Sequence, residues 1–257
     1  MFPCRLKCAF LCFLLLFAAG CVQAPHTDRS QFIMVSRSQT AAMGQKTAEK
    51  IKQEKPISKD PALVGQVRGV GKRISEKSGT DYSWEFNVID KDTVNAFALP
   101  GGNIFVYRGL LEMVDNNAQL ATVIAHEIAH VKARHGAERM SMQMGTNLLG
   151  QLAQAALDME NPKVARTFQQ AYGITSKVGV ILPYSRTQEY EADKIGLILM
   201  AKAGYKPEAA IAFWGKMMEK NKGKQPPSWL STHPPSSRRL NKIREAIPEI
   251  KSKYYRK

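Results

Sequence analysis

The sequence of 257 residues contains few cysteines. All four lie at its N-terminal end, as Cys4, Cys8, Cys12 and Cys21. The first three fall in a segment that we expect to be removed, so the mature chain would keep Cys21 alone. A single cysteine excludes both an intramolecular disulfide and a cysteine-based zinc site. The mature fold must therefore be stabilised mainly by its hydrophobic core.

The N-terminal region lacks an apolar run long enough to span a bilayer comfortably. Its apolar stretch, residues 8–19, has 12 residues and follows the basic residues Arg5 and Lys7. A short apolar run that follows basic residues and ends in small ones is typical of an export signal. We therefore expect residues 1–20 to form a signal peptide.

The signal ends in Leu-Phe-Ala-Ala-Gly, and Cys21 follows it directly. This pattern resembles the lipobox of bacterial lipoproteins, whose cysteine is lipidated and becomes the new N-terminus, although Ala18 stands where leucine is usual. An ordinary cleaved secretory signal is the alternative. Lipidation would anchor the chain to a membrane, with residues 21–35 as a tether. Val22 in place of aspartate suggests, by resemblance to Gram-negative lipoproteins, the periplasmic face of the outer membrane.

Acidic residues are scarce relative to basic ones, at 22 against 37, which gives a formal charge of +15. Removal of the signal peptide, which holds two basic residues and no acidic one, leaves +13. The basic residues are scattered, and no nucleic-acid-binding motif is present. For an exported protein this excess suits an anionic membrane surface or solubility better than nucleic acid.

The residue pattern predicts an α+β fold that is mostly helical, with a small antiparallel sheet, in a single domain at residues 36–250. Asp60 followed by Pro61 predicts the start of one helix, and Ser185 with Gln188 predicts a capping box for another. The expected strands are residues 84–89, 93–99 and 103–107. The expected helices are residues 38–54, 61–77, 108–114, 116–135, 138–159, one from 162, 185–203, 206–220, and a last one ending at 247.

The segment His126-Glu127-Ile-Ala-His130 lies within the predicted helix at 116–135. Residues four apart share one face of a helix, so both imidazoles project to the same side. Two imidazoles at this spacing can bind one zinc ion, with Glu127 beside a metal-bound water. A helix with two unrelated histidines and a solvated glutamate is the alternative.

A catalytic zinc site needs a third protein ligand, with the fourth position open for water. His135 follows His130 by five residues, a helical rotation of about 500°. We therefore expect His135 to lie off the ligand face, at the end of the helix.

The third ligand is predicted in Glu189-Tyr-Glu191-Ala-Asp193. Glu189 and Asp193 share a helix face, and the small residues Ala192 and Gly196 would let that helix pack closely against the His126 helix. We assign Glu189 as the ligand and Asp193 as the carboxylate that orients a ligand histidine through its far nitrogen. Glu191 should point nearly the opposite way. An acidic patch on a solvated helix is the alternative.

The HEIAH and EYEAD segments together resemble the gluzincin zinc metallopeptidase family that includes HtpX, BepA, LoiP and the CAAX prenyl endopeptidases. The small bacterial lipoprotein members and the mitochondrial inner-membrane quality-control protease are the most similar. Residues 95–111 resemble the hairpin that precedes the zinc helix in that family, and Ser-Thr-His-Pro-Pro at 231–235 resembles its late Ser-His-Pro segment. The resemblance covers residues 36–247 and implies a zincin-like fold with an active-site helix.

The resemblance implies a zinc-dependent endopeptidase with one zinc ion per chain and Glu127 as general base. It also implies catalytic roles for His233 and Arg239 over the site, where His233 can close on the zinc as a reversible fourth ligand. The strand at 103–107 would align an extended substrate by main-chain pairing.

The expected substrates are misfolded or unassembled proteins of the bacterial cell envelope. The alternative from another class is a chaperone-like outer-membrane assembly factor with a regulatory metal site. The presence of Glu127 favours catalysis, because a structural site needs no general base.

Overall fold

The computed structural model describes residues 21–27, 29–144, 184–223 and 227–256, which form two compact units. The smaller unit comprises residues 21–24, 29–36 and 136–144, and the larger unit holds the remaining described residues. None of the described helices is both long and apolar enough to cross a membrane. The predicted signal peptide, the segment 145–159 and the helix expected from residue 162 lie outside the described residues. The single domain expected at 36–250 stays a prediction.

In the smaller unit, part of the expected tether is regular structure. β1 (Cys21–Gln23) pairs antiparallel with β2 (Ser30–Phe32), and the backbone N–H of Ala24 donates to the carbonyl of Arg29. The guanidinium of Arg29 binds both carboxylate oxygens of Glu138, at 2.6 and 2.9 Å. A bidentate pair of this kind fixes geometry as well as charge.

The larger unit contains residues 25–27 and then two helices, α2 (Arg37–Glu54) and α3 (Pro61–Ser75), close to their predicted bounds. The Asp60 side chain accepts hydrogen bonds from the backbone N–H groups of Ala62 and Leu63. Pro61 stands at the first helical position, where its missing N–H leaves no bond unmade. The predicted cap of this helix is confirmed.

The sheet of the larger unit is mixed. Its strands β3 (Glu85–Ile89), β4 (Ala96–Leu99) and β5 (Asn103–Tyr107) lie in the order β3-β5-β4, with β5 antiparallel to β4 but parallel to β3. The prediction of an antiparallel sheet is therefore wrong for one of the two pairings. The chain crosses from β3 to the far edge to form β4, turns through residues 100–102, and returns as β5 between the other two.

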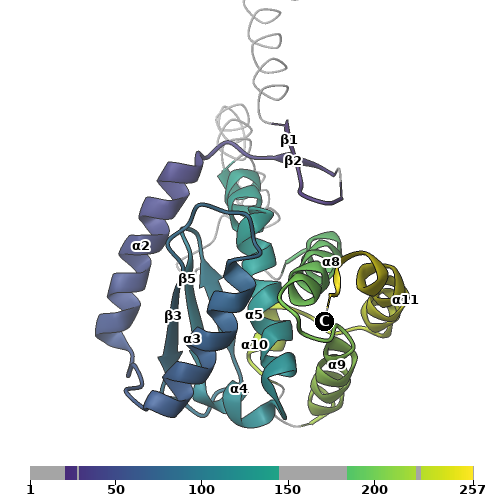
Figure 1. Ribbon diagram of the computed structural model, residues 1–257. Coiled ribbons are helices and arrows are strands. Elements are labelled where there is room, and N and C mark those ends of the chain that lie inside the picture. The colour runs from purple at the N-terminus through teal and green to yellow at the C-terminus, as the bar shows by residue number, and fades with distance from the viewer. Residues whose placement is uncertain (1–20, 28, 145–183, 224–226, 257) are drawn as a thin grey trace, which may run out of the picture. The chain divides into compact units, whose positions relative to one another are not determined.

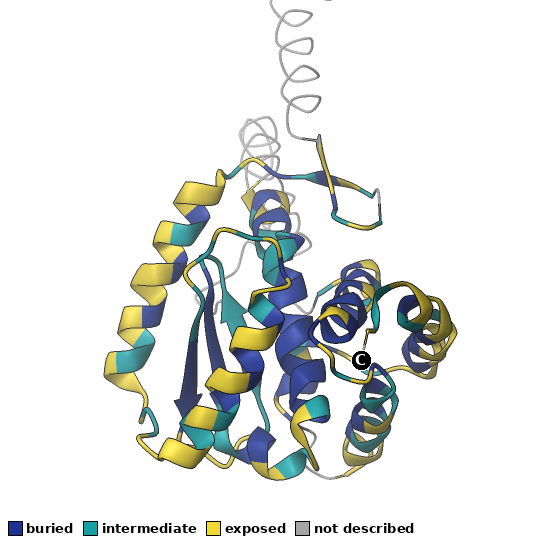
Figure 2. Cartoon of the chain, in the orientation of Figure 1, coloured by how far each residue is buried: buried dark blue, intermediate teal, exposed yellow. Residues whose placement is uncertain are grey.

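The two faces of the sheet are covered by different helices. Phe105 and Ile89 pack with Ala48 of α2 on one face, whereas Ile104 and Val106 belong to the main core on the other. Helices α3 and α5 (Asn117–Lys132) cover this second face (Figure 1). The outward side of α2 is largely exposed and α5 is almost wholly buried (Figure 2). The main core therefore lies between the sheet and the later helices.

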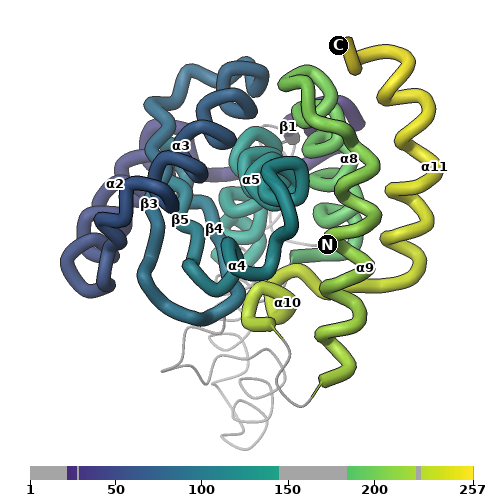
Figure 3. The backbone as a smooth tube through the Cα atoms, turned by 60° about the horizontal axis from the view of Figure 1, so that its bottom comes forward, coloured from purple at the N-terminus to yellow at the C-terminus, as the bar shows by residue number. Residues whose placement is uncertain are grey.

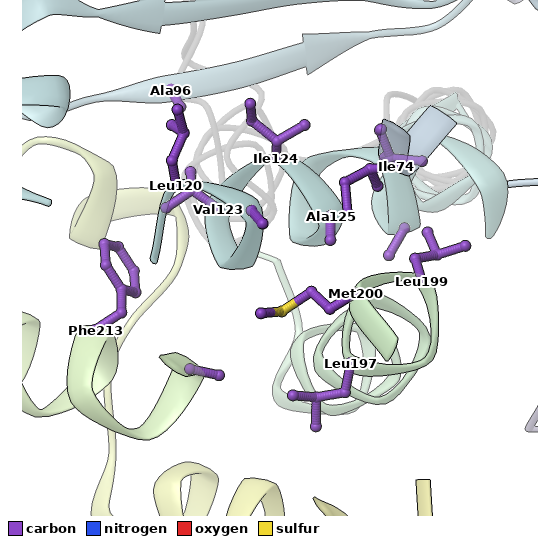
Figure 4. Close-up of a cluster of buried hydrophobic side chains, with 14 of the residues drawn as sticks. Ile74, Ala96, Leu120, Val123, Ile124, Ala125, Leu197, Leu199, Met200 and Phe213 are labelled. Atoms are coloured by element: carbon purple, nitrogen blue, oxygen red, sulfur yellow. The ribbon is translucent and has the colours of Figure 1, made fainter. Parts of the chain in front are cut away.

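Helix α5 (Asn117–Lys132) is the centre of this core and the helix that carries the HEIAH segment. The Asn116 side chain caps it by accepting from the N–H groups of Ala118 and Gln119. Side chains of α5 contact Ala96 of β4 on one side and Met200 of the later helix α8 (Arg186–Lys202) on the other (Figure 4). Each fully buried Leu or Ile here stabilises the fold by roughly 1.5–3 kcal/mol.

The C-terminal part of the larger unit is helical and packs on α5. Helix α8 (Arg186–Lys202) begins at the predicted capping box of Ser185 and Gln188, with both bonds present. It lies between α5 and α11 (Ser237–Tyr254), as Figure 3 shows. Helix α9 (Ala209–Lys220) contacts α5 and α11, and the short α10 is Trp229–Thr232.

Helix α11 continues past its predicted end at Ile247, although Pro248 follows. Proline inside a helix removes one backbone hydrogen bond and disfavours the α conformation of the preceding residue. Ile250 is nevertheless buried in the core, and Tyr254 packs against its edge. The burial of Ile250 and the packing of Tyr254 favour continuation of the helix past the proline.

Candidate metal centre

His126 and His130 lie one turn apart on the buried helix α5, with their Nε2 atoms 3.0 Å apart. Both side chains are only 3% exposed. Their spacing of four residues places the two imidazoles on one face, as the HEIAH segment predicts.

Glu189 approaches these imidazoles from the first turn of α8. Its Oε1 lies 3.3 Å from His130 Nε2, and its Oε2 lies 3.6 Å from His126 Nε2. The two helices come close because Gly196 of α8 faces α5, where an added Cβ would lie 3.3 Å from the backbone nitrogen of His126. Ala192 is buried at the same contact. The predicted small-residue contact between the helices is confirmed.

His233 completes the group from the C-terminal end of α10. Its Nδ1 lies 2.9 Å from Glu189 Oε1 and 3.2 Å from His126 Nε2. Its Nε2 lies 3.4 Å from Glu127 Oε1. The structure thus places His233 in one cluster with His126 and His130 of α5 and Glu189 of α8.

The donor atoms of His126, His130, Glu189 and His233 all lie within 4.8 Å of one another, and all four side chains are buried. Burial lowers the pKa of His130 well below its ordinary value and lowers that of His233 as well. Both imidazoles are therefore held neutral, the form in which they bind metal ions. Imidazole nitrogens with a carboxylate oxygen are the donor set that zinc takes, so these residues fit a zinc ion.

Glu127 is buried beside this cluster. Its Oε1 accepts a hydrogen bond of 2.8 Å from Nε1 of Trp229. Burial raises the pKa of Glu127 to about 7. The carboxyl group thus sits next to the donor atoms, with its orientation set by the indole.

Asp193 supports His126 from behind. Its Oδ1 lies 3.1 Å from His126 Nδ1, the nitrogen that faces away from the donor cluster. The guanidinium of Arg239 holds both carboxylate oxygens of Asp193, with Nε at 2.5 Å from Oδ2 and Nη2 at 2.8 Å from Oδ1. Asp193 therefore lies where the EYEAD spacing placed it.

Arg239 is buried and also forms an ion pair with Oε2 of Glu189. Its guanidinium carbon lies 3.7 Å from the ring centroid of Trp214. Burial acts to raise the pKa of Glu189, but the positive charge of Arg239 and the interactions with His233 and His130 together hold that pKa well below its usual range. The observed polar contacts of Arg239 are with Asp193, Glu189 and the His126 ring, and its contact with an oxyanion or substrate stays a prediction.

The structure leaves His135 outside the donor cluster, as expected, but does not place it at the end of an unbroken helix. Helix α5 ends at Lys132, and a turn at residues 133–134, with Arg134 at φ 58°, precedes a new helix that begins at His135. The rotation of about 500° assumed an unbroken helix. The turn instead brings His135 Nδ1 to 2.8 Å from Nδ1 of His130.

Several neighbours of the cluster were given no role by the sequence. Glu191, expected to point away from the ligand face, is buried, and its Oε2 lies 2.9 Å from His135 Nε2. Tyr184 stacks on the His130 ring with centroids 3.9 Å apart, and Trp229 binds Glu127. The only local signal for Trp229 in the sequence is its position four residues before His233.

The strand expected to align a substrate was assigned wrongly. β5 pairs with β3 on one side and with β4 on the other, so its main-chain groups are already used. Among the described strands, β4 forms the edge of the sheet nearest α5.

A sequence model described as "Peptidase family M48" matches residues 61–247. The mitochondrial metalloendopeptidase OMA1 of Schizosaccharomyces pombe is 42% identical over 190 residues, which cover 73% of this chain and 54% of the relative. The β-barrel assembly-enhancing protease of Escherichia coli K12 is 30% identical over 251 residues, which cover 93% of this chain and 51% of the relative. The chain thus spans about half the length of these two relatives. The matches confirm the resemblance carried by the HEIAH and EYEAD segments.

Proposed function

Because the chain belongs to peptidase family M48, we propose that it is a zinc-dependent endopeptidase of the bacterial cell envelope. Its substrates are misfolded or unassembled envelope proteins. The observation that carries the proposal is the buried group of His126, His130 and Glu189 with the Glu127 carboxyl beside it.

Peptidases of family M48 use zinc, and the donor set of this chain suits that ion. His126, His130 and Glu189 would hold it, one ion per chain. When bound, zinc acts as a Lewis acid, which lowers the pKa of a water and polarises a carbonyl group. The remaining chemistry belongs to side chains of the protein.

Glu127 serves as the general base in this proposal. Its carboxylate takes a proton from the attacking water and passes that proton to the leaving amine. The indole of Trp229, which donates to Oε1, fixes the carboxylate next to the donor atoms. Asp193 keeps His126 oriented, and Arg239 holds the carboxylates of Asp193 and Glu189 in place.

An extended substrate would pair with the outer edge of β4. Among the described strands only β5 pairs with β4, and the α5 helix lies against it. Main-chain pairing gives affinity with little sequence preference, which suits the degradation of unfolded chains.

The place of action follows from the N-terminal expectations. The predicted signal and lipidated Cys21 would anchor the chain at the periplasmic face of the outer membrane. The Escherichia coli relative is by name a protease that enhances β-barrel assembly, whereas the OMA1 relatives are by name mitochondrial. A Cys21→Ser variant that stayed in the membrane fraction would contradict this anchor.

The second candidate is a chaperone-like assembly factor with a regulatory metal site. The position of His233 favours it, because a fourth protein donor closes a zinc site and structural sites are closed. In the catalytic proposal, His233 is a reversible ligand that leaves the cluster when substrate binds.

A Glu127→Gln variant distinguishes these candidates. The proposed peptidase predicts that the variant keeps one zinc ion but no longer cleaves casein, an unfolded substrate. Casein cleavage at the wild-type rate would refute the role of Glu127. If the variant fully restores envelope assembly to a strain that lacks the protein, the assembly role is favoured.

A further inference from the structure

A row of hydrogen bonds leads from His130 to the N-terminal segment at residues 25–27. His130 Nδ1 lies 2.8 Å from His135 Nδ1, and His135 Nε2 lies 2.9 Å from Glu191 Oε2. The hydroxyl of Thr27 donates to the other oxygen of Glu191, Oε1. His135 and Glu191 are both buried. The proposed hydrolysis uses none of His135, Glu191 and Thr27.

The protons along this row can be assigned in one consistent direction. His130 directs Nε2 at the donor cluster, so in the neutral imidazole its proton lies on Nδ1. That N–H donates to Nδ1 of His135, whose own proton then lies on Nε2 and is donated to Glu191. An ionised carboxylate accepts from both neighbours, so each group in the row has its partner.

The other ligand histidine has a shorter support of the same kind. His126 Nδ1 faces the carboxylate of Asp193 directly, at 3.1 Å. A carboxylate behind a ligand imidazole fixes its tautomer and ring orientation and raises its basicity. For His130, the corresponding carboxylate is that of Glu191, and the imidazole of His135 lies between the two.

We infer that His135, Glu191 and Thr27 are positioning residues that orient His130 as a metal ligand, as Asp193 orients His126. The inference rests on the proposed assignment of His130 as a ligand. It predicts that metal affinity, and not only activity, depends on residues that never touch the metal.

The backbone at the end of α5 supports this role. Arg134 has φ 58°, a left-handed conformation that is uncommon for residues other than glycine. Such strained conformations cluster at functional sites, where the surrounding structure holds them. Here the turn re-aims His135 from the expected helix end onto His130.

The row also joins two distant parts of the sequence. Thr27 stands six residues after Cys21, and Glu191 stands on α8. The segment that follows the predicted lipidation site thus contributes a hydroxyl group to the support of a metal ligand.

Zinc affinity of the full-length apoprotein, measured by competition with a chromogenic chelator, tests the inference. His135→Phe removes the acceptor for His130 at similar size, and Glu191→Leu removes the terminal carboxylate. Each should weaken zinc binding about 10- to 100-fold. Glu191→Gln keeps an oxygen that accepts from His135, so it should stay within about threefold of wild type. In the holoenzyme, KM for casein should be unchanged while kcat falls.

Gln119→Met is the matched control. Gln119 is a buried polar residue of α5, the helix that carries His130, but its side chain binds Asp115 instead of the cluster. It should lower thermal stability without changing zinc affinity. An equal loss of affinity in this control, or affinities within twofold of wild type in both His135→Phe and Glu191→Leu, would overturn the inference.

Thr27 provides a test that does not depend on a buried substitution. Thr27→Val removes the hydroxyl and should bind zinc a few-fold more weakly than Thr27→Ser, which keeps it. Equal zinc affinities of Thr27→Val and Thr27→Ser would overturn the role of Thr27. If His135→Phe and Glu191→Leu fail to fold, the same result would overturn the whole inference. Separately, His130→Ala should release the zinc. If it does not, the proposed ligand assignment fails, whatever the positioning variants show.

Discussion

Removal of the Arg239 side chain should destabilise the metal-free protein strongly. The guanidinium binds Asp193 bidentately and pairs with Glu189, and all three groups are buried. Removing one partner of a buried ion pair leaves an uncompensated charge and costs about 3–5 kcal/mol. Arg239→Met keeps much of the side-chain volume, so the loss of charge dominates. For a unit of this size, the melting temperature should fall by roughly 6–20 °C.

Urea unfolding in EDTA and in saturating zinc measures this effect. The loss should be smaller with zinc, because the cation compensates the Glu189 carboxylate and binding stabilises the folded state. The neighbouring Arg238 is exposed, so Arg238→Met should change the free energy of unfolding by less than about 0.5 kcal/mol. If Arg239→Met in EDTA lies within about 1 kcal/mol of this control, the argument from buried charge is refuted.

Three further predictions concern the same centre. Gly196→Val should push α8 away from the backbone of His126, destabilise the fold by about 1–3 kcal/mol and weaken zinc binding. Its control, Gly69→Ala on α3, adds a Cβ that meets no atom, so it should stabilise the fold by roughly 0.5–1 kcal/mol. Thermal unfolding and chelator competition measure both variants, and equal melting temperatures would contradict the packing argument. Asp193→Leu removes the oxygen that faces His126 Nδ1, so it should speed zinc release and lower zinc affinity about 10- to 100-fold; unchanged release in a stopped-flow chelator assay would count against this contact. EDTA should abolish casein cleavage and one equivalent of zinc should restore it; cleavage that persists without metal would exclude zinc chemistry.

The sequence predicted the parts of the centre that depend on local spacing. His126 and His130 need only one helical turn between them, and the capping box at Ser185 sets the start of the helix that carries Glu189. Helix periodicity and caps are local properties, so they can be read without the fold.

The parts that failed depend on tertiary structure. The turn at Arg134, which brings His135 to His130, has no glycine or proline to indicate it. The insertion of β5 between β3 and β4 is a property of chain topology, since a hairpin pattern fits either strand order. The extension of α11 beyond Pro248 follows from burial of Ile250, which only the packed core reveals.

The central claim is that one zinc ion is bound by His126, His130 and Glu189 on α5 and α8. Anomalous X-ray diffraction at the zinc edge, from crystals of the full-length protein, tests it most directly. The account predicts a single strong peak about 2.0–2.2 Å from Nε2 of both histidines and from a carboxylate oxygen of Glu189. A zinc ion bound elsewhere, or no peak between these side chains in zinc-saturated crystals, would contradict it.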